Sequence, residues 1–91
     1  MQIKVYATLR ELLGLTSLSM SVATMSTVGD VLRALGRSYP KLEAKLWDAE
    51  QNRTGYVTVL LNGRSIDYLQ GLATPVGDTD VIALFPPVGG G

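Results

Sequence analysis

One clearly marked helix stands between two groups of alternating strands, and this order limits the possible folds more than any other feature. Thr27 and Asp30 are spaced for reciprocal capping, with Thr27 as N-cap and Asp30 at the third helical position. Pro40 ends the helix, because a proline drives the preceding residue out of the α region. Apolar residues recur between these limits at helical spacing: Val28, Val31, Leu32 and Leu35.

Alternation of apolar and polar side chains predicts the strands. Residues 2–8 form the first strand, with one face made of Ile3, Val5 and Ala7 and the other of Lys4, Tyr6 and Thr8. After a break at Gly14, a second strand carries Leu18, Met20 and Val22 on one face and completes a hairpin. Three more strands follow the helix: 56–61, 64–66 after the Asn62-Gly63 turn signal, and 81–85.

Shorter elements fill the intervals between the helix and these strands. Residues 41–47 form a short second helical turn, because Leu42 and Leu46 are four apart, and the polar stretch 48–55 is a loop. Leu69 and Leu72 are expected to be tucked beneath the sheet. A hairpin, a crossing helix and a return beside the first strand make an α+β roll, and 91 residues suffice for one domain.

The sequence ends on an apolar strand, two prolines and three glycines, Phe85-Pro86-Pro87-Val88-Gly89-Gly90-Gly91. Proline lacks a backbone donor, so pairing stops after Phe85. Glycine has no Cβ and can pass through a slot too narrow for any other residue. The six steps from Phe85 to Gly91 reach roughly 20 Å when extended. We predict a rigid body with a thin probe that presents the Gly91 carboxylate; the alternative is a terminal segment without function.

The last strand also predicts a partner surface. If Ile82 and Leu84 face the helix, Phe85 faces away on the open side of the sheet, together with Val81 and Ala83. Tyr6 and Leu60 would join them there. An apolar patch on an open sheet face marks a surface for a protein partner. The alternative is that Phe85 is a core residue.

Composition removes several classes of function. Eight basic and eight acidic residues cancel, so there is no basic field for nucleic acid or for an anionic membrane. No apolar run approaches the length of a bilayer span, and the first strand begins at once without a signal peptide, so we expect a cytoplasmic location. The sequence has no cysteine and no histidine. We therefore expect no thiolate chemistry, no metal site, no cofactor and no self-contained enzyme.

Four segments, in order, resemble the MoaD/ThiS family of β-grasp, ubiquitin-like sulfur carriers, and within it the MoaD-like branch of archaeal type. They are the opening strand and corner at 5–14, the capped helix start at 27–32, the strand and turn at 59–63, and the tail from Leu84 to Gly91. The resemblance implies a β-grasp roll with a mixed sheet of four to five strands and one main helix on one face. It divides the chain into a domain at 1–85 and a flexible reactive tail at 86–91.

The resemblance also implies a mechanism. A ubiquitin-activating-type adenylyltransferase, which itself binds the ATP, joins AMP to the Gly91 carboxylate, and sulfur then replaces an oxygen to give a thiocarboxylate. The chain is a carrier, the small subunit of molybdopterin synthase, whose large subunit is a second partner. Family positions assign partner binding to Tyr6, Arg10 and Phe85, and Leu60 joins them through its predicted place on the open face of the sheet. Threading of the tail into a partner falls to Pro86, Pro87, Val88, Gly89 and Gly90, although the family usually has Ser, Thr or Ala at position 89.

Other uses of the same activated terminus remain open. The carrier could deliver sulfur to thiamine, cysteine or tRNA thiolation rather than to molybdopterin. Gly91 could instead be joined to lysines of target proteins, as in a ubiquitin-like modifier. The Phe85-Pro86-Pro87 run favours the molybdopterin branch over the thiamine branch. A purely structural module is disfavoured by the combination of tail and apolar patch.

Overall fold

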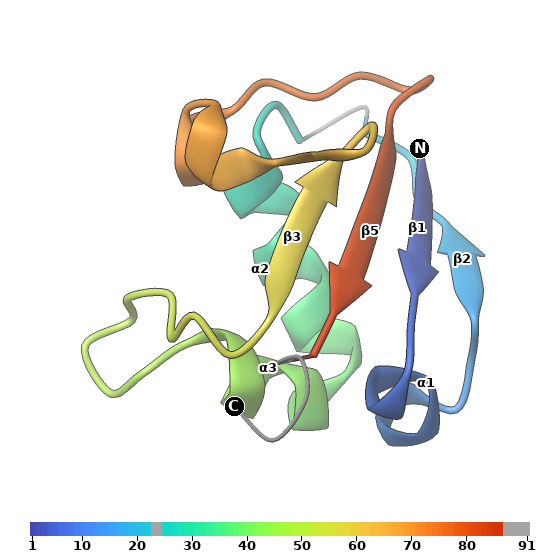
Figure 1. The fold of residues 1–91 in the computed structure, drawn as a ribbon, viewed down its shortest axis with the longest axis vertical. Helices are drawn as coiled ribbons and strands as arrows, with labels where there is room; N and C mark the ends of the chain where they lie inside the picture. Colours follow the sequence, from blue (N-terminus) through green and yellow to red (C-terminus); the bar gives the residue numbers. More distant parts are fainter. Residues whose placement is uncertain (23–24, 87–91) are drawn as a thin grey trace.

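The computed structural model describes residues 1–22 and 25–86. A twisted five-stranded sheet lies against two helices, which cover one of its faces (Figure 1). The strands are β1 (Gln2–Val5), β2 (Ser17–Ser19), β3 (Thr58–Leu61), β4 (Arg64–Ser65) and β5 (Val81–Phe85). The helices are α1 (Thr8–Leu13), α2 (Val28–Ser38) and α3 (Pro40–Leu46), with 3-10 turns at Ile66–Tyr68 and Gly71–Ala73. The predicted mixed sheet with one main helix is confirmed.

The strand order is β2-β1-β5-β3-β4, so the last strand lies at the centre of the sheet. β1 and β5 run parallel, with Val5 opposite Leu84, and every other neighbouring pair is antiparallel. Because parallel strands end at the same edge, the end of β5 lies beside the end of β1 and next to α1 (Figure 1). The topology thus places the end of the first strand beside the end of the last strand.

The start of α2 matches the sequence prediction in atomic detail. The Asp30 backbone N–H donates to Thr27 Oγ1 at 3.2 Å, and the Thr27 backbone N–H donates to Asp30 Oδ2 at 3.2 Å. The Ser26 backbone N–H also donates to Asp30 Oδ2, and this bond, together with those to Thr27, holds the pKa of Asp30 below its usual value. Four buried apolar side chains of α2 then face the sheet, as the spacing predicts. Pro40 both ends this helix region and opens α3, where a proline at the first turn is tolerated.

The structure corrects the opening segment. The strand predicted over 2–8 ends at Val5, and Ala7 is an exposed residue with a φ of 54° rather than a member of the inner face. The chain turns there into α1, which the sequence analysis had treated only as a corner. Leu9 and Leu13 of this helix are buried, and Gly14 ends it in the left-handed conformation. Alanine rarely adopts a positive φ, so the sequence does not indicate a turn at Ala7. The alternation therefore predicts a strand that extends beyond Val5.

Smaller differences concern the ends of elements. β3 begins at Thr58 rather than Tyr56, and the second predicted strand shortens to Ser17–Ser19. Ile66 is buried at the start of a 3-10 turn rather than part of β4. Of the two leucines expected beneath the sheet, Leu72 packs against the core, but Leu69 is 36% exposed. Leu69 lies between the two 3-10 turns, as the residue that follows Ile66–Tyr68.

Candidate tail-exit site

Two aromatic side chains meet where β5 ends. The Tyr6 backbone N–H donates to the Leu84 carbonyl at 3.1 Å and so extends the β1–β5 pairing by one step. The rings of Tyr6 and Phe85 are stacked, with centroids 4.4 Å apart and planes 4° from parallel. Stacked aromatic pairs contribute about 0.5–1.5 kcal/mol beyond their buried area. The pair therefore joins the residue that follows β1 to the last residue of β5.

Arg10 completes this cluster from α1. Its guanidinium carbon lies 5.3 Å from the centroid of the Tyr6 ring, and its Nε donates to the Val5 carbonyl at 2.8 Å. The turn at Ala7 is what brings the helix back over the strand end, since the Arg10 backbone N–H also bonds the Ala7 carbonyl. One nitrogen of the guanidinium is thus used to hold it in place, while the side chain stays exposed. We call Tyr6, Arg10 and Phe85 the exit cluster.

The outer face of the sheet has the sidedness predicted from the sequence. Ile82 and Leu84 are fully buried, whereas Val81, Ala83 and Phe85 are half-buried on the opposite face. The alternative that Phe85 is a core residue is therefore excluded. Leu60, also half-buried, stands opposite Ala83 on the neighbouring strand and lies in the same outer stripe. The structure thus brings Tyr6, Arg10 and Phe85 into contact and places Leu60 one strand away.

The sequence analysis did not assign a role to the polar residues of this outer face. Lys4 is exposed on β1, opposite Ala83 on one side and Ser17 on the other, and Thr58 stands opposite Phe85. The signal was present, because Lys4 and Tyr6 alternate onto one face of the same strand. None of the five strands in the described part of the chain contains Asp or Glu. The charge of this face is therefore cationic, from Lys4 and Arg10.

Of the predicted tail, Pro86 alone belongs to the described residues. It follows β5 directly and is buried. Pro87, Val88, Gly89, Gly90 and Gly91, to which threading and chemistry were assigned, lie outside the described residues.

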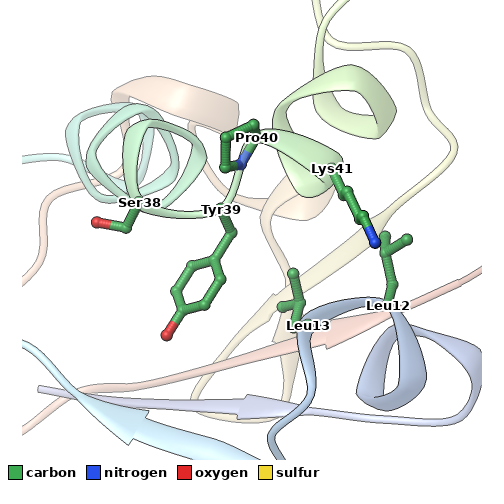
Figure 2. Close-up of a pocket in the computed structure, with 6 residues that line it drawn as sticks. All are labelled: Leu12, Leu13, Ser38, Tyr39, Pro40 and Lys41. Atoms are coloured by element: carbon green, nitrogen blue, oxygen red, sulfur yellow. The ribbon is translucent and has the colours of Figure 1, made fainter.

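A hollow of about 210 Å³ lies on the helical side of the sheet, between α1 and the junction of α2 with α3 (Figure 2). Leu12, Leu13 and Tyr39 form its apolar lining, and Ser38 and Lys41 stand on opposite sides of Tyr39. This hollow has no carboxylate in its lining and does not join the exit cluster. Across residues 1–22 and 25–86 there is no group of three or more acidic side chains that could hold a metal ion. No helix in these ranges is both long and apolar enough to cross a bilayer.

The comparisons with known proteins agree with this geometry. A family model described as the ThiS family matches residues 3–91. The chain belongs to the ThiS family. This ThiS-family chain is 40% identical to small archaeal modifier protein 3 of Haloferax volcanii, in an alignment that covers all of this chain and 98% of the relative. It is 37% identical to small archaeal modifier protein 1 of the same organism, in an alignment that covers all of both chains.

Solved structures confirm the β-grasp fold. The crystal structure of small archaeal modifier protein 1 from Haloferax volcanii superposes with a TM-score of 0.85 at 33% identity, covering 99% of this chain and 97% of that one. The family and the fold expected from the four matching segments are therefore both confirmed, including their archaeal type. At this level the chain belongs to a family of small ubiquitin-like sulfur carriers and modifiers.

Proposed function

We propose that this protein acts through its C-terminal Gly91, which a ubiquitin-activating-type adenylyltransferase joins to AMP. The observation that carries the proposal is the exit cluster: a stacked aromatic pair and an exposed arginine lie at the point where a glycine-rich end leaves the sheet. A carboxylate is a poor electrophile, and adenylation supplies it with a good leaving group. Residues 1–85 serve as the rigid body in this scheme, and residues 86–91 as the reactive tail.

In the first form of the proposal, the activated Gly91 becomes a thiocarboxylate that donates sulfur in molybdopterin synthesis. Hydrosulfide supplied by a partner displaces AMP, so that the C–S bond of the thiocarboxylate forms as the C–O bond to AMP breaks. A synthase large subunit then covers the outer face of the sheet. The run Phe85-Pro86-Pro87 supports this branch over the thiamine branch. Tyr6, Arg10, Leu60 and Phe85 would contact the partner. Pro86 to Gly90 would lie along its active-site channel.

A second form joins Gly91 to lysines of other proteins. The names of the two Haloferax volcanii relatives, both called modifier proteins, favour it. Both forms need the same adenylate, and they differ in the nucleophile that attacks it: a sulfur atom in the first and a lysine amine in the second. Mass spectrometry of material from the protein's own cells distinguishes them. The first form leaves a terminal thiocarboxylate, which the intact mass of this protein reveals. The second form leaves Gly91 remnants on target lysines, which are found in digests of the other cellular proteins.

Removing Gly91, or adding one residue after it, should abolish adenylation, because either change moves the terminal carboxylate out of register with the bound ATP. The measurement is ATP–pyrophosphate exchange with the purified cognate adenylyltransferase. Tyr68→Ala is the matched control, since this side chain is 85% exposed on a 3-10 turn away from the exit cluster. Exchange by either altered terminus at the wild-type rate would overturn the proposed function.

A further inference from the structure

Lys4 is a charged side chain on the outer face of the sheet, and the apolar stripe does not explain its position. It lies on β1, the second strand from the edge, so it is not a charge that protects an exposed sheet edge. It is exposed, and no hydrogen bond or ion pair holds its ammonium to another described residue. Its neighbours across the sheet, Ala83 and Ser17, are small and uncharged.

Position makes this charge significant. Lys4 lies on β1 two residues before Tyr6, about 6.6 Å along an extended chain, and the Arg10 guanidinium lies 5.3 Å from the centroid of the Tyr6 ring. Lys4 is directly opposite Ala83, which is itself opposite Leu60, so it borders the apolar stripe of Leu60, Ala83 and Phe85. A partner that covers the stripe must also cover Lys4.

Burial of an unpaired ammonium is costly, because its hydration is lost and nothing replaces it. The described strands offer no carboxylate that could move onto Lys4 when water is excluded. Asp80, which directly precedes β5, already accepts hydrogen bonds from Asn62 Nδ2 and the Gly77 backbone N–H. We therefore expect the compensating charge to come from the other protein. A surface that is apolar throughout would fit the stripe, but it would leave the ammonium buried without a partner.

We infer that Lys4 determines which partners can use this face, by requiring an Asp or Glu carboxylate on the partner surface opposite Ala83 at the edge of the apolar stripe. The partner chemistry is an apolar patch with an acidic residue set into it. Proteins that lack this carboxylate are rejected even where their shape fits, which is how a charged group gives specificity. The inference rests on the proposed function, since it names the chemistry of the partner that meets the tail.

Titration calorimetry tests the role of Lys4. The full-length protein is titrated against the purified cognate adenylyltransferase, and the dissociation constant is measured. Lys4→Glu should weaken binding by about 30-fold or more, in the range found when one partner of a buried charge pair is removed. Lys4→Met, which keeps the apolar stem, should also weaken it, whereas Lys4→Arg should stay within about threefold of wild type. Lys41→Glu is the matched control, because Lys41 is equally exposed on α3, on the helical side.

A carbodiimide that condenses an amine with a carboxylate, with loss of water, provides the second readout. Mass spectrometry should find the partner's Asp or Glu joined to Lys4 and not to Lys41. Reversing that partner residue to Lys should restore binding of Lys4→Glu. Equal binding of Lys4→Glu and wild type, while Phe85→Ala binds weakly, would overturn the role of Lys4 and leave the proposed function intact. A wild-type protein that is neither bound nor adenylated would overturn the proposed function itself.

Discussion

Helices α1 and α2 start in opposite ways. At α2, Thr27 and Asp30 satisfy each other's backbone donors. At α1, the residue before the helix is Ala7, with φ 54° and ψ −134°, and no side chain caps the first turn. Residues other than glycine rarely adopt such a conformation, and it costs about 1–3 kcal/mol where it occurs.

The contrast separates a helix start that stabilises the fold from one that positions a site. α2 lies on the covered face of the sheet, and the side chains that it buries there are apolar. α1 is short, but its turn at Ala7 sets Arg10 over the Tyr6 ring beside Phe85. Unfavourable backbone geometry persists where the surrounding structure holds it in place, and such positions cluster at binding sites. The protein thus places its strained turn next to the aromatic pair at the end of β5.

Phe85→Ala should have the largest effect on the α1 side. Loss of an interface aromatic should weaken binding to the adenylyltransferase by about 2 kcal/mol or more. Because Phe85 is half-buried, the loss in unfolding free energy should stay below the roughly 3–5 kcal/mol of a core aromatic. Calorimetry and chemical denaturation measure the two quantities, with Tyr68→Ala as control. A large loss of stability with unchanged binding would contradict the division between the two sides.

Thr27→Ala tests the α2 side. Removal of the hydroxyl that accepts the Asp30 N–H should lower the unfolding free energy by about 1 kcal/mol. Thr27→Ser keeps the acceptor and should cost much less. Adenylation rates of both variants, measured well below their melting temperatures, should equal that of wild type. A slower rate in fully folded Thr27→Ala would show that the covered face also acts on the tail.

Ala7→Gly and Ala34→Gly, the same substitution at two helices, should change stability in opposite directions. Glycine adopts a positive φ at no steric cost, so relief of strain at Ala7 should exceed the greater freedom of the unfolded chain and raise stability by up to about 1 kcal/mol. In the interior of α2, Ala34→Gly should lower it by about 1 kcal/mol. Thermal denaturation compares the two. Destabilisation by both substitutions would show that the turn at Ala7 is not strained.

The comparison also shows which parts of the molecule can be predicted from sequence. The start of α2 depends on residues three apart, and the sidedness of β5 follows from alternation, so both were predicted. The stacked ring of Tyr6 was placed on the correct face for the same reason. The turn at Ala7 could not be predicted, because neither glycine nor asparagine marks it. Leu9, Leu12 and Leu13 have helical spacing, and this signal in residues 8–13 could have revealed α1.

Parallel pairing of the first strand with the last has a consequence for protein synthesis. Tyr6 and Arg10 leave the ribosome early, but Phe85 comes almost last, and β5 must enter the centre of the sheet between β1 and β3. Pairings between residues so distant in sequence form late in folding. A released chain that has not yet folded would therefore carry the glycine residues without the aromatic pair. Under the proposed function, a partner that recognises the pair together with the glycine residues would distinguish folded molecules from unfolded ones, and activation would depend on folding.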